Sequence, residues 1–329
     1  MNFAAPLAPA AQDFREMVVA EALRAAETAQ HVNMRIAGDD LRLDVADPGL
    51  GAALLPAIHH HEIPAAADPT RLIVGSFPLP QFPWGPENLG RGGAVAGLSQ
   101  GPVRATASAD DSSLMLWDAG RRLACCWFAS LDGVRPWDRA APLRNALHFA
   151  LAGPHRQLVH GAVVGVDGRG ALLAGPGGSG KSTTTLAAIH AGMQVVGDDY
   201  AAVELDGRRA QAWNLYCSVK IGERDGGPHG IDRRQTLIIG RDLPGAMTES
   251  LTLTTVLLPR VTGGPVSSLT EASPAAALRA LAPSTLLQAP HDDHPDMGLM
   301  VALARRLPAY HLKLGADQGI PAIREALAL

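Results

Sequence analysis

Residues 171–192 read ALLAGPGGSGKSTTTLAAIHAG, and this stretch decides the fold of the second half of the chain. The segment from Gly175 to Ser182 matches the pattern G-x-x-x-x-G-K-[ST] in full, between an apolar strand-like run and a helix-forming run. Glycines let successive backbone N–H groups curl around one anion, and the start of the following helix adds its positive end. The pattern and its flanks therefore predict a P-loop that binds the phosphates of a nucleotide.

Each part of the motif has an expected task. The ammonium of Lys181 reaches the β- and γ-phosphates, and the hydroxyl of Ser182 holds Mg²⁺. The nucleotide is expected to contact the loop and the first helical turn, at Gly175, Gly177, Gly178, Ser179, Gly180, Lys181, Ser182 and Thr183. The motif alone does not define the reaction, because ATPases, GTPases and kinases share it.

Two adjacent carboxylates, Asp198 and Asp199, follow the next strand-like run, 17 and 18 residues after Lys181. The expected position at the loop edge of the sheet brings one carboxylate near Mg²⁺ and the other near the terminal phosphate, where an acceptor hydroxyl would lie. A carboxylate that accepts a hydroxyl proton is what phosphoryl transfer to an alcohol requires. The pair therefore favours a kinase.

The segments LVHGAVV, GALLAGPGGSGKSTTTLAAIHAG and MQVVGDDYAAVEL together resemble the catalytic core of HPr kinase/phosphorylase. The resemblance covers residues 155–205. It implies an α/β fold of the HPr-kinase/PEP-carboxykinase type, a P-loop kinase core with a mixed sheet, and ATP and Mg²⁺ as cofactors.

The same resemblance implies a role for each matching residue. Lys181 and the loop amides would hold the ATP phosphates, and Ser182 and Asp199 would hold Mg²⁺. Asp198 would be the general base toward an acceptor serine hydroxyl. His160 would lie near the transferred phosphate and tune the pKa of its neighbours.

Sequence runs outside residues 155–205 indicate which subgroup of this family the chain resembles. The stretch GERDGGPHGIDRRQTLIIG (222–240) does not match the family's glycine-rich signature, which serves the reverse phosphorolysis. The runs LYCSVKIG, LLPRVTG and ALRALAPSTLLQ are more similar to HPr-kinase-like proteins found beside peptide-modifying enzymes, including lasso-peptide clusters. This similarity implies that the partner is a peptide or protein with an acceptor serine.

Three alternatives stay open. A small-molecule kinase of the shikimate type also places acids about 17 residues after the lysine, but such chains use spaced aspartates and a parallel sheet, whereas hairpins are expected here at 160–175 and 201–213. A carboxykinase-like enzyme would need a further metal-binding lysine and histidine. A nucleotide-dependent regulatory protein would not need the lysine, the serine and both acids intact.

Lysine is rare in this chain: of 28 basic residues, Lys181, Lys220 and Lys313 are the three lysines. Lys220 follows the second expected hairpin, and Arg260 ends a strand-like run that looks buried. Both are candidates for contacts with phosphate or substrate. The segments 59–62 and 291–294 are rich in His and acidic residues, but neighbours on one segment seldom converge on one metal ion.

Composition excludes several classes of protein. The net charge of −4 and the 18% of charged residues provide no basic stripe for nucleic acid. No apolar run reaches the ~18 residues that would span a bilayer, and no signal peptide is evident, so the expected location is the cytoplasm without membrane contact. A homo-oligomer stays open. The three cysteines are expected to be reduced thiols.

The first part of the chain, 1–150, is expected to be an α+β domain with an accessory or substrate-recognition role. Its patterns predict a helix at 12–30, a strand at 71–77, irregular backbone at 78–93, a hairpin at 113–129 and a helix at 141–151. The second part, 151–329, is expected to be the P-loop kinase domain. Beyond the two hairpins, its patterns predict strands at 193–197, 251–259 and 310–315, and helices from 273, near 296–307 and at 321–329.

Overall fold

The computed structural model describes residues 9–79, 86–99, 101–207, 209–222, 235–243, 245–288 and 297–329. The chain divides into two compact units. One extends to Leu151 and includes residues 286–288, and the other consists of Ala152–Thr285 and residues 297–329. The division falls at Leu151, one residue from the boundary that the sequence suggests. The acidic and histidine segment 291–294 and most of the stretch 222–240 lie outside the described residues.

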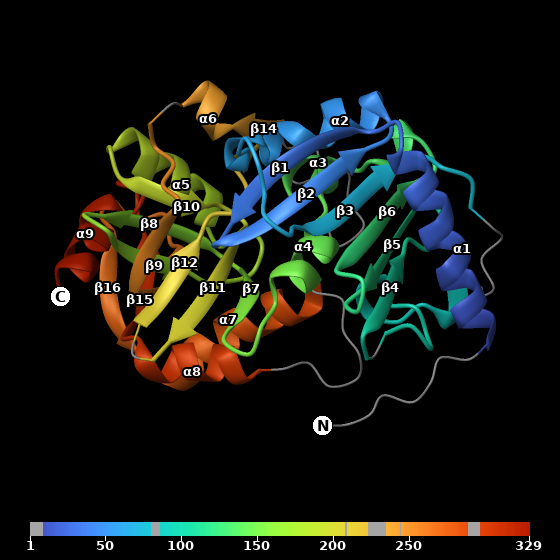
Figure 1. Cartoon of the computed structure of the whole chain (residues 1–329). Coiled ribbons are helices and arrows are strands. Elements are labelled where there is room, and N and C mark those ends of the chain that lie inside the picture. The colour runs from blue at the N-terminus through green and yellow to red at the C-terminus, as the bar shows by residue number, and fades with distance from the viewer. Residues whose placement is uncertain are drawn as a thin grey trace. The chain divides into compact units, whose positions relative to one another are not determined.

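The first unit is built on a mixed sheet of order β1-β2-β3-β6-β5-β4 (Figure 1). Its parallel pairs are β2 with β3 and β3 with β6, and the other neighbours are antiparallel. The strands are β1 (Gln30–Ile36), β2 (Asp39–Val45), β3 (Thr70–Gly75), β4 (Val103–Ala107), β5 (Ser113–Asp118) and β6 (Leu123–Phe128). The α-helices are α1 (Pro9–Ala26), α2 (Pro48–Leu54), α3 (Pro136–Ala140) and α4 (Arg144–Leu151).

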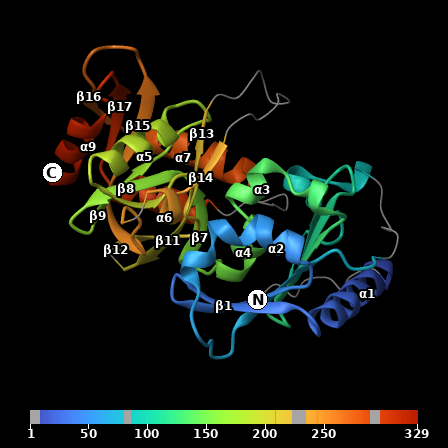
Figure 2. The same ribbon diagram turned by 90° about the horizontal axis from the view of Figure 1, so that it is seen from above.

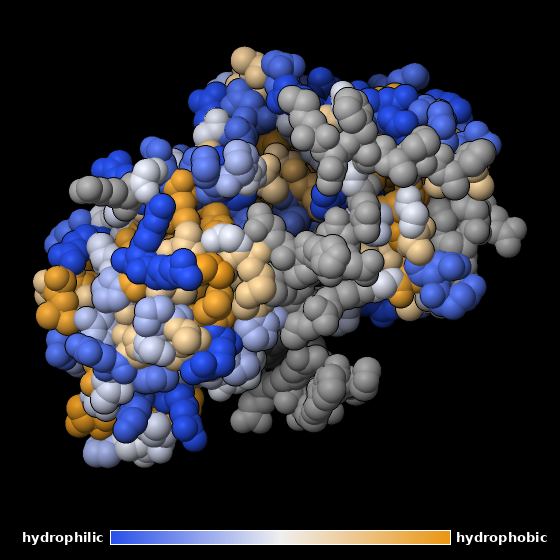
Figure 3. All heavy atoms as spheres, turned by 90° about the horizontal axis from the view of Figure 1, so that it is seen from below, coloured by the Kyte–Doolittle hydropathy of each residue, from blue (hydrophilic) through white to orange (hydrophobic). Residues whose placement is uncertain are grey.

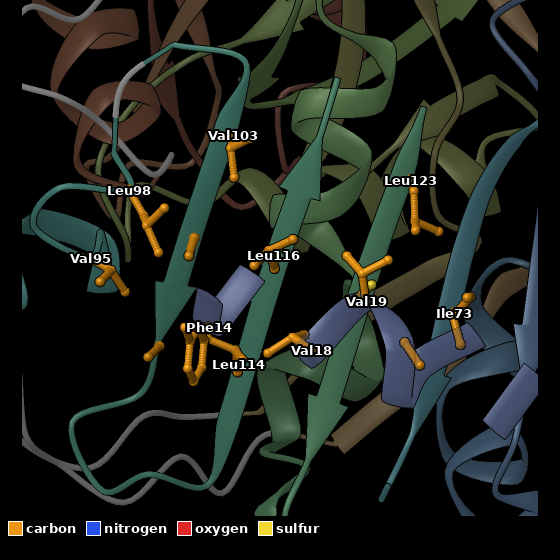
Figure 4. Close-up of a cluster of buried hydrophobic side chains, with 14 of the residues drawn as sticks. Phe14, Val18, Val19, Ile73, Val95, Leu98, Val103, Leu114, Leu116 and Leu123 are labelled. Carbon is orange, nitrogen blue, oxygen red and sulfur yellow. The ribbon is translucent and has the colours of Figure 1, made fainter. Parts of the chain in front are cut away.

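Helix α1 covers this sheet with one apolar face. Phe14, Val18 and Ala22 recur at a spacing of four and are almost fully buried. Figure 4 shows Phe14, Val18 and Val19 among the strand residues Leu114 and Leu116, which belong to the same buried cluster. The helix expected at 12–30 is confirmed, but it starts at Pro9 and ends at Ala26 because β1 begins at Gln30.

The strand expected at 71–77, the hairpin expected at 113–129 and the helix expected at 141–151 are confirmed. They are β3, the β5–β6 hairpin and α4. The expectation of irregular backbone at 78–93 is wrong in part, because short 3-10 helices form there. The 3-10 helices of this unit are η1 (Leu55–Ala57), η2 (His59–His61), η3 (Pro86–Asn88), η4 (Arg91–Gly93) and η5 (Leu131–Gly133).

The second unit carries the P-loop on a mixed sheet of order β10-β8-β9-β15-β12-β11-β7, with β17 beside β15 and β16 beside β17. The expected mixture of parallel and hairpin-paired strands is therefore confirmed. Its strands are β7 (Arg156–His160), β8 (Ala162–Val166), β9 (Arg169–Leu173), β10 (Gln194–Gly197), β11 (Tyr200–Asp206), β12 (Arg209–Trp213), β15 (Ser250–Val261), β16 (Ser268–Ala272) and β17 (Ala309–Leu314). A separate two-stranded sheet joins β13 (Ser218–Ile221) to β14 (Gln235–Ile238).

Strand β15 organises this sheet. It pairs in parallel with β9 along one edge. Along its other edge it pairs first with β12, over 250–252, and then with β17, over 256–261. The long strand thus joins the hairpin β11–β12 to the strands that surround the P-loop.

The run LVHGAVVGV, expected as one strand of a hairpin, is two strands that meet at Gly161. The part before Gly161 pairs with β11, and the part after it pairs with β9 and β10. A Cβ at Gly161 would lie 2.9 Å from the carbonyl oxygen of Leu173, so only glycine allows the backbone to pass this closely. The change of partner at Gly161 explains why an unbroken apolar run does not form one strand.

Helix α5 (Lys181–His190) packs against β8 and β10, and helix α9 (Ile320–Ala328) packs against β8 and β9 (Figure 2). The apolar core beneath them includes Val164, Leu173, Ala188 and Ile323, all fully buried. The remaining α-helices that begin in this unit are α6 (Ile239–Asp242), α7 (Pro274–Gln288) and α8 (Gly298–Arg306), and the last three residues of α7 belong to the first unit. The expected helices near 273, 296–307 and 321–329 are confirmed by α7, α8 and α9.

Within the described residues, none of the helices is long and apolar enough to cross a bilayer. On the face drawn in Figure 3, apolar residues are interspersed with hydrophilic ones.

Candidate active site

The P-loop connects β9 to α5 through residues 174–180. Gly178 and Gly180 have φ angles of 81° and 104°, in the left-handed region that side chains with a Cβ rarely adopt. Gly180 is the residue immediately before the helix, and a Cβ there would lie 2.5 Å from Cδ1 of Leu314. Backbone conformation and close packing both require glycine at position 180.

The side chain of Lys181 folds back over this loop. Its ammonium donates hydrogen bonds to the carbonyl oxygens of Gly175 at 2.7 Å and Pro176 at 3.2 Å, and only 7% of the residue is exposed. Burial lowers the pKa of Lys181, against the opposing effect of the nearby carboxylates of Asp199 and Asp198. The ammonium is therefore held inside the curl of the loop, where phosphate oxygens would offset the cost of its burial.

Ser182 connects the start of α5 to the aspartate pair. Its hydroxyl donates a 2.8 Å hydrogen bond to Oδ2 of Asp198. Asp198 is 2% exposed, and no partner is found for its Oδ1 among the described residues. Burial, followed by the charge of Asp199, raises the pKa of Asp198 to about 6, although the hydroxyls of Ser182 and Thr185 act in the opposite direction.

Asp199 has the opposite environment. Its Oδ2 accepts a 2.5 Å hydrogen bond from the ammonium of Lys220, and its Oδ1 lies 3.2 Å from Nε2 of His160. Burial raises the pKa of Asp199, but the hydrogen bond with His160 and the charge of Lys220 outweigh this effect and hold the pKa well below its usual range. Two adjacent carboxylates thus differ in protonation: Asp199 stays ionised, whereas Asp198 titrates closer to neutral pH.

His160 reaches the pair because β7 lies beside β11. The register places His160 directly opposite Tyr200, the residue after Asp199. The backbone N–H of His160 donates to the hydroxyl of Thr285, and its ring meets the ring of Tyr200 edge-on, with centroids 5.2 Å apart. These contacts fix the imidazole, which is 6% exposed, against Asp199.

The structure brings together most of the residues that the sequence singles out: Lys181, Ser182, Asp198, Asp199, His160 and Lys220. One pairing differs from the implied one, because Ser182 donates to Asp198 and not to Asp199. Gly177, Gly178 and Thr183 are exposed at the loop and first turn, whereas Gly175 and Ser179 are buried. Arg260 is exposed near the end of β15, next to Val261.

Two further residues hold the site and are not evident from motifs. Asn214, 2% exposed, donates its side-chain amide to the carbonyl oxygen of Val196, two residues before Asp198. Thr185 donates to the carbonyl oxygen of Lys181 at 3.0 Å and acts on the pKa of Asp198. Its position four residues after Lys181 puts both on one helix face, a signal that the sequence offers. Asn214 has no comparable signal.

The donors and acceptors fall into two groups. Loop amides, the helix start and the ammonium of Lys181 suit an anion with several oxygens. The hydroxyl of Ser182 and the carboxylates of Asp198 and Asp199 suit a hard divalent cation. The site can therefore accommodate a phosphate chain together with a metal ion.

No family model and no curated protein matches the chain. Among solved structures, the Hpr(Ser) kinase/phosphatase from Coxiella burnetii is similar over 52% of this chain and 93% of its own, with 13% identity and a TM-score of 0.30. A TM-score this low establishes neither a shared fold nor a shared function.

Proposed function

We propose that the protein is an ATP- and Mg²⁺-dependent kinase that transfers the γ-phosphate of ATP to a serine hydroxyl of a peptide or protein. The observation that carries the proposal is the hydrogen bond between Ser182, at the start of the P-loop helix, and Asp198. It joins the phosphate-binding element directly to a buried carboxylate of raised pKa.

In this proposal the phosphates bind at the position where the ammonium of Lys181 donates hydrogen bonds to the loop. Its ammonium satisfies two loop carbonyls, those of Gly175 and Pro176, and can exchange them for β- and γ-phosphate oxygens. Gly177 and Gly178 are exposed, and their backbone N–H groups are proposed to complete the phosphate cradle.

The residues fit a magnesium ion. Oδ1 of Asp198 is buried without a partner among the described residues, beside a serine hydroxyl and an ionised Asp199. Ser182 and Asp199 would hold the ion. When bound, Mg²⁺ neutralises charge on the phosphates.

Asp198 is proposed as the general base. Proton acceptors work best when their pKa lies near the working pH, and the pKa of about 6 for Asp198 meets this condition better than the lowered pKa of Asp199. In the transfer, the serine oxygen forms a bond to the γ-phosphorus, the bond from that phosphorus to the bridging oxygen breaks, ADP leaves, and the hydroxyl proton passes to Asp198.

His160 and Lys220 are proposed as positioning residues that hold Asp199, and Lys220 and Arg260 as cations within reach of phosphate or substrate. Lys220 is the better supported of the two, because its ammonium lies in the aspartate cluster.

The acceptor is proposed to be a peptide serine, as in the kinases of lasso-peptide clusters to which the runs at 215–222, 257–263 and 277–288 are similar. Recognition of that peptide is proposed for the first unit. A kinase of a small-molecule hydroxyl is the alternative, because the phosphate and aspartate cluster would serve either acceptor.

The test is transfer of labelled phosphate from ATP. The protein is incubated with Mg²⁺, labelled ATP and serine-containing precursor peptides, and in parallel with free serine and sugars. We expect label in peptides, with none in matched peptides that carry alanine for serine. Lys181→Ala is expected to weaken ATP binding by about ten- to a hundredfold, the loss of a charged hydrogen-bond donor. Normal ATP binding by Lys181→Ala, or label in small molecules alone, would contradict the proposal.

A further inference from the structure

Residues 261–266, the last residue of β15 and the turn that follows it, expose two large apolar side chains. Val261 is 61% exposed and Val266 is 69% exposed. In the described part of the second unit, the other exposed large apolar residues are Leu329, which is 75% exposed, and Met297, which is 36% exposed. A pair of valines on one short turn is a local concentration of unburied apolar surface.

Val261 lies next to Gly180, the last residue of the loop before α5. A Cβ on Gly180 would lie 3.3 Å from Cγ2 of Val261 and 2.5 Å from Cδ1 of Leu314. The apolar surface of Val261 therefore begins where the backbone of the P-loop ends and α5 starts.

Hydrogen bonds to residues 314–317 hold the turn in place. The backbone N–H and the hydroxyl of Thr262 both donate to the carbonyl oxygen of Leu314 at 3.0 Å. The N–H of Ala316 donates to the carbonyl oxygen of Gly264 at 2.9 Å, and Asp317 accepts from the N–H and hydroxyl of Ser267. The two valines are thus held in place by the backbone that carries them.

The order of the strands gives the direction of a bound nucleotide. The P-loop strand β9 lies between β8 and β15. The aspartate pair follows β10, on the far side of β8, whereas Val261 ends β15. A phosphate chain whose terminal phosphate lies toward Asp198 therefore directs its nucleoside toward β15.

We propose that the nucleobase of the bound nucleotide lies on the apolar surface formed by Val261 and Val266. The inference rests on the proposed nucleotide-dependent function and adds the position and chemistry of the base site. Flat heteroaromatic rings gain affinity by covering apolar surface that water otherwise wets.

The same surface has a consequence for specificity. The hydroxyls of Thr262 and Ser267 and the carboxylate of Asp317 are all engaged inside the protein. The side chains that Val261 and Val266 offer to the base are therefore apolar, and apolar surfaces discriminate weakly between rings of similar shape. ATP and GTP are expected to bind with affinities within about tenfold of each other.

The experiment compares two probes, ATP and inorganic tripolyphosphate, by calorimetry in the presence of Mg²⁺. The double variant Val261→Ser/Val266→Ser removes apolar surface without adding charge. It is expected to bind ATP about tenfold more weakly than the wild type, and tripolyphosphate with unchanged affinity. Leu329→Ser, at an exposed apolar residue elsewhere in the unit, is the matched control and should change neither affinity.

Equal loss of ATP and tripolyphosphate affinity would overturn the inference, because the valines would then act through the P-loop. Unchanged ATP affinity would overturn it as well. A wild-type protein that binds neither probe would refute the proposed function itself, so the two failures are distinguishable.

Discussion

The hydroxyl of Ser182 donates a 2.8 Å hydrogen bond to Oδ2 of Asp198. This bond connects the first turn of α5 to the end of β10 across 16 residues of chain. It also places a carboxylate with a pKa of about 6 at the positive end of a helix. The proposed chemistry of the protein depends on that pairing.

Replacement of Asp198 by asparagine is expected to reduce phosphoryl transfer by about 10²–10⁴-fold, the range for loss of a general base. Asparagine keeps the acceptor for Ser182 but cannot take a proton. The measurement is kcat with labelled ATP, alongside the affinity for Mg²⁺-ATP. The control is Asp206→Asn, at an exposed end of β11. Full transfer by Asp198→Asn would show that another group is the base.

The same variant is expected to be more stable than the wild type at neutral pH. Burial raises the pKa of Asp198 from 3.8 to about 6, so the folded state binds this proton more tightly than the unfolded state does. The contribution to stability is therefore full below about pH 4 and is lost as pH rises through 6. Asparagine mimics the protonated form, and its gain should grow to about 3 kcal/mol above pH 6.

Chemical denaturation of both proteins in a chelating buffer, at pH 4 and pH 7, measures this gain. The two free energies of unfolding should differ at pH 7 and converge at pH 4. Equal stability at both pH values would mean that Asp198 is not strained by its burial.

Gly180→Ala is expected to lower the free energy of unfolding by about 2 kcal/mol or more, because φ is 104° and the new Cβ would overlap Leu314. Gly177→Ala in the same loop is the matched control, since a Cβ there would have no heavy atom within 4 Å. Thermal unfolding of the two variants checks the contrast. Similar losses for both would argue against the close packing at position 180.

Lys220→Met is expected to reduce kcat by about 10²-fold, as for removal of a charged group that stabilises the transition state. The variant removes the 2.5 Å hydrogen bond to Asp199, so the pKa of that carboxyl should also rise. Lys313→Met is the control, because Lys313 is exposed on β17. The measurement is kcat of both variants, on samples shown to be folded. Equal kcat values would show that Lys220 does not contribute to phosphoryl transfer.

Local signals in the sequence were sufficient for the strand, glycine-rich loop and helix at 169–190 and for the hairpin that precedes the loop. Asp167 and Gly168 both have positive φ, as a two-residue hairpin turn requires, and the Asp-Gly pair announces this turn. The P-loop is recognisable because its glycines, lysine and serine act within one short segment. Each of these features depends on neighbours in the chain.

Contacts between distant segments were not predictable. Lys220 meets Asp199 through strand β13, which has weak local patterning, and His160 meets Asp199 because β7 pairs with β11. The change of partner at Gly161 was hidden for the same reason, since an apolar run does not show which strand it will join. These pairings depend on the packing of the whole unit.

The pairing of strand β15 on both edges has a consequence for local unfolding of the second unit. Val256 and Leu257 are paired on both edges, with β9 on one side and β17 on the other. Amide hydrogens in such a doubly bonded centre exchange with solvent only when the whole unit unfolds. Val261 lies four residues further along the same strand, against Gly180. We therefore expect the loop at 174–180, which lies next to Val261 at Gly180, to keep its shape when other parts of the unit open locally.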